Sequence, residues 1–155
     1  MFVMKIISWN VRGLGGFEKK REVSQLVREK KSFILCIQET KLSVIDGLVC
    51  KSIRGDTNVD FSFQASRGAS GGLVTLWDVK EVEVWSSSQL EHVLGIHGRF
   101  VKSGEEFFML NVHAPCDISR QQTLWYNISL RLATLSDNNV CVCGDFNFVR
   151  CLEER

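Results

Sequence analysis

The chain has 155 residues, of which 45% are hydrophobic and 24% are charged, and its formal net charge is +1. This length and composition predict one globular domain with a sizeable core. A net charge so close to zero excludes a global field that draws in nucleic acid, so any such binding requires a local patch. The sequence shows no export signal and no apolar run of membrane-spanning length. We therefore expect a cytoplasmic or nuclear protein with no membrane contact, whose oligomeric state the sequence leaves open.

Cysteine and histidine residues do not form a recognisable metal motif. None of the cysteines stands in a CxxC pair, and His92 and His97 lack the spacing of a zinc site. Because no export signal is present, we expect every cysteine to be a reduced, structural residue. The six are Cys36, Cys50, Cys116, Cys141, Cys143 and Cys151.

The first forty residues predict a strand, a helix and a second strand. Phe2–Trp9 is a β-branched and aromatic run, and the glycine-rich segment 11–16 after it lacks the GK[ST] of a phosphate-binding P-loop. Residues Glu18–Lys31 have one apolar stripe and otherwise charged side chains, which predicts a helix. The run Ser32–Ile37 predicts the second strand. The pattern does not decide between a parallel βαβ unit and a hairpin-like unit.

The middle of the chain is less regular and then rich in strands. We expect Leu42–Gly71 to consist of long loops that hold one strand near 60–65. Four further strands are predicted, and an antiparallel meander is the simplest arrangement for them. They cover residues 71–77, 79–85, 92–101 and 106–112.

The last part of the chain predicts one more helix and one more strand. The chain's one proline, Pro115, ends the preceding strand, and Asp117 is a suitable cap for a helix that reaches Leu135. Alternating Val and Cys over 140–143 predict a short, largely buried strand that Gly144 ends. Strands with two outer helices then indicate an α+β sandwich within a single domain, residues 1–155.

Polar side chains follow several of the predicted strands. Asn10, Glu39 and His113 stand at three strand ends, and Asp145 and Asn147 stand at a fourth. Each has an ordinary structural explanation: Asp145 and Asn147 could form a hydrogen-bonded turn, Asn10 could cap the glycine loop, and Glu39 could pair with a lysine. Together they make a set suited to phosphodiester chemistry. One or two carboxylates hold Mg²⁺, a carboxylate accepts a proton from water, and amides donate to phosphate oxygens.

Four short motifs in this order resemble the endonuclease/exonuclease/phosphatase superfamily, the DNase I-like proteins. They are SWNVRG at 8–13, IQETK at 37–41, NVHAP at 111–115 and GDFN at 144–147. The WNVRGL opening, the ETK ending and the terminal RCLEER at 150–155 are most similar to the apurinic-type endonuclease domain of plant LINE-type retrotransposon proteins. The resemblance implies a four-layered α/β sandwich that acts on DNA with Mg²⁺ or Mn²⁺.

The resemblance also implies a role for each matching residue. Glu39 is similar to the metal-binding glutamate, with Gln38 as its supporting partner, and Asn10 is similar to the asparagine that helps order the metal and phosphate. Asp145 matches the aspartate that orients or deprotonates the attacking water, and Asn147 matches the asparagine that contacts the phosphate. His113 stands where many relatives have a phosphate-contacting tyrosine.

The resemblance covers almost the whole chain but only the N-terminal portion of the family's domain. Members continue past GDFN to a later acidic residue and a Ser-Asp-His motif, which are not found after Asn147. We therefore expect a C-terminally incomplete sandwich that has little nuclease activity as this chain. The alternatives are a non-catalytic nucleic-acid-binding or interaction remnant and, less compatible with ETK, a phosphatase or phosphodiesterase of the same superfamily.

Overall fold

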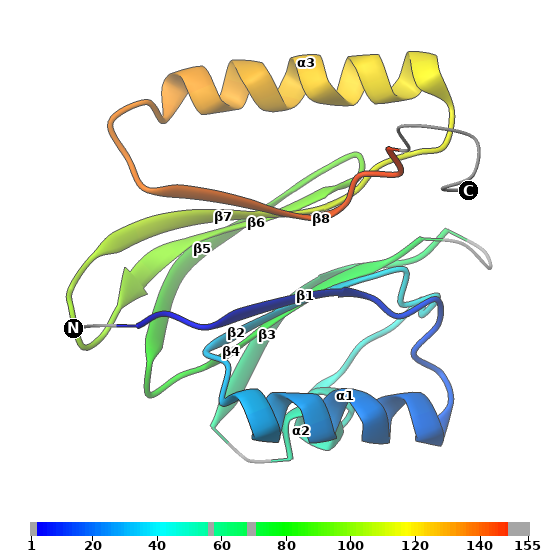
Figure 1. Ribbon diagram of the computed structural model, residues 1–155, viewed down its shortest axis with the longest axis vertical. Coiled ribbons are helices and arrows are strands. Elements are labelled where there is room, and N and C mark those ends of the chain that lie inside the picture. Colours follow the sequence, from blue (N-terminus) through cyan, green and yellow to red (C-terminus); the bar gives the residue numbers. More distant parts are fainter. Residues whose placement is uncertain (1–2, 56–57, 68–70, 149–155) are drawn as a thin grey trace.

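The computed structural model describes residues 3–55, 58–67 and 71–148. Within these residues, two four-stranded sheets pack face to face and three helices lie on their outer faces. Helices α1 (Phe17–Lys30) and α2 (Gly47–Arg54) cover the first sheet, and α3 (Ile118–Thr134) covers the second (Figure 1). This arrangement confirms the predicted four-layered α/β sandwich. No helix in the described part of the chain is long and apolar enough to span a membrane.

The first sheet has the strand order β1-β2-β4-β3. Strands β1 and β2 run parallel with α1 between them, so this unit is a βαβ unit rather than a hairpin. Strand β4 is antiparallel to both of its neighbours. The strands are β1 (Ile6–Asn10), β2 (Ile34–Gln38), β3 (Val59–Gln64) and β4 (Leu73–Asp78).

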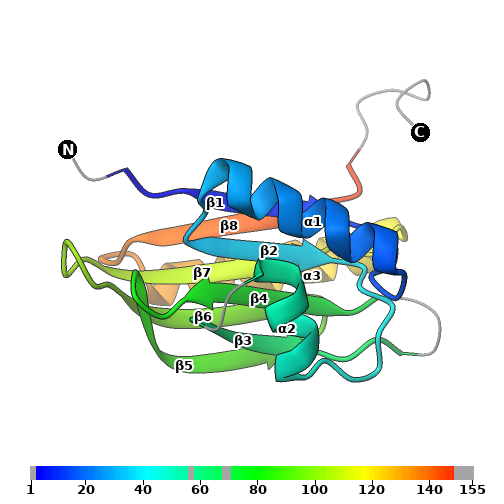
Figure 2. The same cartoon turned by 90° about the horizontal axis from the view of Figure 1, so that it is seen from below.

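The second sheet has the strand order β5-β6-β7-β8. Strands β5 to β7 form an antiparallel meander, and β8 returns through α3 to run parallel to β7. Figure 2 shows β1 of one sheet and β8 of the other lying along the same side of the sandwich. The strands are β5 (Val82–Leu90), β6 (Val93–Phe100), β7 (Glu106–His113) and β8 (Val140–Asp145).

Three apolar clusters fill the spaces between the four layers. The first joins α1 and α2 to the first sheet and includes the stripe residues Val23 and Val27. The second lies between the two sheets around Cys36 and Met109, and the third joins α3 to the second sheet around Leu124 and Ile128. Both predicted apolar stripes therefore face a core. Burial of these side chains, at roughly 25 cal/mol per Å² of apolar surface, is the main stabilising contribution.

Helix α2 corrects the prediction of long loops over Leu42–Gly71 and of only two helices. Asp46 caps it by accepting a hydrogen bond from Val49 N at 3.0 Å, and Gly55 ends it in the left-handed conformation with φ +75°. Cys50 and Ile53 on its inner face are fully buried. The helix has only eight residues, too few for a repeating apolar stripe to stand out in the sequence.

Two strand predictions are also wrong in detail. The strand over 71–77 belongs to the first sheet, so the meander contains only β5, β6 and β7. Gly144 does not end the last strand, because β8 runs on to Asp145. Gly144 has a φ of +146°, and it lies so close to the Val112 backbone that there is no space for a Cβ atom. Finally, β8 is half-buried rather than largely buried because it pairs only with β7 among the described strands.

Candidate active site at the rim of the two sheets

The sequence-predicted residues gather at one rim of the sandwich. Asn10 ends β1, and its register partner on parallel β2 is Gln38, the residue before Glu39. His113 ends β7 and is paired in register with Asp145 at the end of parallel β8. Because parallel strands end at the same edge of a sheet, each sheet brings its own pair of polar residues to this rim.

A side-chain hydrogen bond joins the two sheets at the rim. Asn10 Nδ2 donates to Asp145 Oδ2 at 2.6 Å, which links residues that are 135 positions apart in the sequence. Asn10 Oδ1 accepts from the backbone N of Arg12 at 3.0 Å, so this asparagine also caps the glycine-rich loop. Asn10 therefore holds the Asp145 carboxylate in place and orders the loop that follows β1.

Asp145 and Asn147 form the hydrogen-bonded turn that the sequence allowed. The backbone N of Asn147 donates to Asp145 Oδ1 at 2.9 Å, and Asn147 has a left-handed backbone with φ +47°. The Asn147 side chain donates to the carbonyl oxygen of Ala114, the residue after His113. The turn thereby fixes the carboxylate and ties it to the NVHAP segment.

Glu39 stands directly after β2 in an unusual backbone conformation. Its φ is +57°, and that of Lys41 is +56°. Lys41 Nζ lies 3.4 Å from Glu39 Oε1, which is the lysine pairing that the sequence left open. Backbone hydrogen bonds hold this turn from both sides: Gly13 N donates to Glu39 O at 2.8 Å, and Thr40 N donates to Gly72 O at 3.2 Å. Left-handed backbone at a non-glycine residue costs on the order of 1 kcal/mol or more and is found preferentially at functional sites.

Below the rim, a buried amide pair connects the two sheets, and sequence reasoning identified only one of its members. Gln38 Nε2 donates to Asn111 Oδ1 at 2.8 Å and to Ser8 Oγ at 3.1 Å. Asn111 Nδ2 in turn donates to Val74 O at 3.1 Å. Both amides are buried, with Gln38 1% and Asn111 0% exposed. The sequence did carry a signal for Asn111, which is a polar residue within the apolar run FFMLNV at 107–112. An amide buried in such a strand requires a hydrogen-bond partner.

The rim offers oxygen ligands that suit a hard divalent cation. Its two carboxylates are those of Glu39, directly after β2, and Asp145, the last residue of β8, and both are partly exposed. No group of three or more His, Cys, Asp or Glu side chains within the described residues forms a ready metal cage. Mg²⁺ keeps several waters and needs only one or two carboxylates, so this donor set fits Mg²⁺ better than a metal that requires nitrogen or sulfur.

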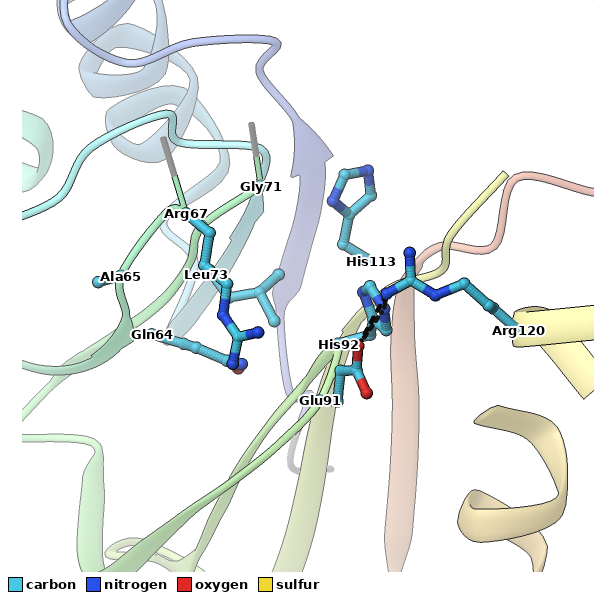
Figure 3. A pocket seen from close by; sticks show the side chains of 10 residues that line it. Gln64, Ala65, Arg67, Gly71, Leu73, Glu91, His92, His113 and Arg120 are labelled. Carbon is cyan, nitrogen blue, oxygen red and sulfur yellow. Dashed lines mark hydrogen bonds and ion pairs between the residues drawn. The ribbon is translucent and has the colours of Figure 1, made fainter. Parts of the chain in front are cut away.

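A cavity of about 210 Å³ adjoins the rim and was not predicted from the sequence. Figure 3 shows His113 above it, with Arg67 and Arg120 approaching from opposite sides. Arg120 Nη2 lies 2.8 Å from Glu91 Oε1 and 3.4 Å from His92 Nε2. No motif marks this cluster, because Glu91 and His92 lie in the β5–β6 turn and reach Arg120 only through the tertiary fold.

The protonation of this cluster follows from its contacts. Burial lowers the pKa of the His92 imidazole, the positive Arg120 lowers it further, and Glu91 opposes both effects. The hydrogen bond from Arg120 holds the pKa of the exposed Glu91 carboxyl below its usual value. At neutral pH the cluster therefore contains a neutral histidine beside an arginine–glutamate ion pair.

Within the described part of the chain, the cysteines are not among the polar residues that form the rim. Five are free thiols, and Cys151 lies outside the described residues. Burial raises the pKa of the Cys50 thiol to about 12. The hydrogen bond that the Cys36 thiol donates to Cys143 raises the pKa of Cys36, and burial between the sheets raises it further. These thiols are structural, as predicted.

The chain is similar to several known proteins over nearly all of its length. It is 28% identical over 152 residues to a protein named exodeoxyribonuclease from Bacillus subtilis (strain 168), covering 93% of this chain and 58% of that protein. The human nocturnin catalytic domain superposes with a TM-score of 0.70 at 14% identity, covering 94% of this chain and 64% of that one. TDP2 from Caenorhabditis elegans superposes with a TM-score of 0.72 at 17% identity, covering 96% of this chain and 48% of that one.

These relatives extend beyond the matched region, since this chain spans between about half and two thirds of each. The structural neighbours share the two-sheet DNase I-like fold. They also include a mannosyl-6-phosphatase from Bacteroides thetaiotaomicron, at 14% identity and a TM-score of 0.69. The model of the endonuclease/exonuclease/phosphatase family matches residues 7–153, which include every motif at the rim. The chain belongs to the endonuclease/exonuclease/phosphatase family.

Proposed function

We propose that this chain is the N-terminal portion of a divalent-metal-dependent phosphodiester hydrolase that nicks DNA. The observation that carries the proposal is the 2.6 Å hydrogen bond from Asn10 to Asp145. This bond holds the Asp145 carboxylate of the second sheet against the end of β1 in the first sheet. Strand β1 pairs with β2, which Glu39 follows directly. The name of the Bacillus subtilis relative supports DNA as the substrate. The SWNVRG and ETK motifs favour the LINE-type endonucleases within the family.

The rim residues have distinct tasks in this proposal. Glu39 would hold the Mg²⁺ or Mn²⁺, and Asn10 would help to order the metal region. When bound, the metal neutralises phosphate charge and polarises a phosphoryl oxygen. Asp145 accepts a proton from the attacking water, and Asn10 keeps this carboxylate aimed at it. The bond from the water oxygen to phosphorus forms as the bond to the leaving sugar oxygen breaks, and solvent protonates that oxygen. His113 and Asn147 donate hydrogen bonds to the phosphate oxygens.

Nicking of supercoiled plasmid by the purified chain, in Mg²⁺ and in EDTA, tests this proposal. We expect slow nicking that requires the metal, because the chain spans only 58% of its Bacillus subtilis relative. Glu39→Ala should abolish it because the metal loses its carboxylate ligand. Asp145→Ala should abolish it because loss of a general base costs roughly 10²–10⁴ in rate. Glu105→Ala, which removes a carboxylate from the hairpin before β7, is the matched control and should leave nicking unchanged.

Three results would contradict the proposal. Nicking that survives Glu39→Ala would refute the metal assignment, and nicking in EDTA would refute the metal dependence. Folded protein that does not nick at all, yet binds DNA equally with and without the Glu39→Ala change, would favour the non-catalytic nucleic-acid-binding alternative. Its DNA affinity should then fall steeply with salt.

A further inference from the structure

Two adjoining cavities meet at the Glu91–His92–Arg120 cluster. The first, which we call the rim cavity, measures about 210 Å³ and is bordered by Arg67, His92, His113 and Arg120. The second, the helix cavity, measures about 440 Å³ and lies along α3. Glu91, His92 and Arg120 line both. The helix cavity is bordered further by Leu90, Thr123, Leu124 and Asn127.

The rim cavity has the chemistry of an anion site. Arg120 and Arg67 bring positive charge from opposite sides (Figure 3). Within the described residues, the side-chain contacts of Arg120 with Glu91 and His92 both use Nη2, and a guanidinium carries five donors. Arginine binds phosphate oxygens through paired donors. The Glu91 carboxylate opposes an anion here, and its side chain is 63% exposed, so it can turn into solvent.

The helix cavity differs in character and suits a flat, partly apolar group. Leu90 and Leu124 form apolar walls, and Thr123 and Asn127 add polar groups. Arg120, Leu124 and Asn127 follow one another at helical spacing, so α3 presents them on one face. The cavity volume of about 440 Å³ falls within the range of roughly 300–1,000 Å³ typical of small-molecule sites. A nucleobase has apolar faces and a hydrogen-bonding edge, which matches these walls.

We propose that the two cavities together bind one nucleotide of the substrate, with its phosphate against Arg120 in the rim cavity and its base in the helix cavity. This inference rests on the proposed function, because His113 links the rim cavity to the rim residues. The bound nucleotide is the one next to the cleaved phosphodiester. Asn127 then reads the edge of its base, which gives the enzyme a sequence preference at that position.

Binding measured in EDTA separates this inference from catalysis. Isotope-labelled chain is titrated with inorganic phosphate, deoxyribose 5-phosphate and the four deoxynucleoside 5′-monophosphates, and amide signals are followed by NMR. We expect at least one nucleotide to bind roughly 3- to 10-fold more tightly than deoxyribose 5-phosphate, with shifts along α3. Arg120→Ala should weaken every phosphate-bearing probe by about tenfold or more. Glu91→Gln should strengthen them all.

Asn127→Leu tests the base-binding part of the inference separately from the phosphate-binding part. It should weaken nucleotide binding roughly 3- to 10-fold and leave inorganic phosphate unaffected. Ser129→Leu makes a similar change at another exposed position of α3 and should alter neither. Equal binding of nucleotides and deoxyribose 5-phosphate would overturn the inference, as would identical behaviour of the two leucine variants. Nucleotide binding as expected, together with no metal-dependent nicking, would refute the proposed hydrolysis while the nucleotide site stands.

Discussion

The side-chain amides of Gln38 and Asn111 meet at 2.8 Å in the space between the two sheets. Gln38 precedes Glu39 on β2, and Asn111 lies two residues before His113 on β7. The pair therefore sets how the rim residues of the first sheet stand relative to those of the second. A buried polar pair of this kind favours a single alignment of the two sheets, because any displacement leaves amide groups without partners.

Replacing Asn111 should therefore destabilise the whole fold. Asn111→Ala leaves the Gln38 amide and the Val74 carbonyl without this partner in a buried space. We expect the free energy of unfolding to fall by about 2–3 kcal/mol in urea denaturation. Asn138→Ala, which removes an exposed amide after α3, should change it by less than about 0.5 kcal/mol. Equal stability of the two variants would show that the buried pair contributes little.

Gly72 should be intolerant of any side chain. Its φ is +94°, and an added Cβ would overlap the Thr40 side chain, next to Glu39. We expect Gly72→Ala to lower the free energy of unfolding by more than about 1 kcal/mol and to weaken binding of Mn²⁺ at the rim. Gly47→Ala is the control, because a Cβ at Gly47 would meet nothing within 4 Å. The two variants are compared by urea denaturation and by Mn²⁺ titration.

His92 should make stability depend on pH in a defined direction. Burial lowers its pKa in the folded protein, with Arg120 and His113 acting in the same sense and Glu91 against them. The unfolded chain then binds more protons, so the free energy of unfolding falls as pH drops below about 6.5, the ordinary histidine value. The loss levels off once the folded-state pKa is passed. Denaturation curves of His92→Gln should lack this slope, whereas those of His97→Gln should keep it.

Thiol reactivity should distinguish the buried cysteines from the exposed one. Cys50 is fully buried on α2, and burial raises its pKa to about 12, whereas Cys116 is exposed after Pro115. Since the thiolate is the reactive form, we expect iodoacetamide near neutral pH to modify Cys116 and to spare Cys50. Peptide mass spectrometry of the labelled native chain reads this out. Labelling in urea, where both should react, is the control.

The sequence predicted those parts of the fold that local patterns encode. The apolar stripes of α1 and α3 predicted both long helices to within a residue or two, and Asp117 caps α3 as expected. The end of the first strand at Asn10 was predicted correctly, whereas β8 runs past Gly144 to include Asp145, and the structure adds the hydrogen bond between Asn10 and Asp145. The motif order indicated the family, which the comparisons show.

Features that depend on contacts distant in the sequence were missed. Helix α2 is defined by its caps and by one buried face of three residues, one of them the charged Arg54, which is too little for a periodic apolar signal. The assignment of β4 to the first sheet depends on pairing with β2, whose partner residues lie 35 to 43 positions earlier in the chain. The Glu91–His92–Arg120 cluster joins a hairpin turn to a helix 28 or more positions away. No local pattern encodes such a meeting.

The bond between Asn10 and Asp145 joins the first described strand to the last, across 135 positions. Closing so long a loop carries a large entropic cost before the contact forms, so contacts of this range form late and slowly during folding. During synthesis on the ribosome the rim cannot assemble until β8 has emerged. A chain interrupted between Glu39 and Asp145 would therefore retain Asn10 and Glu39 but would lack the carboxylate that Asn10 holds.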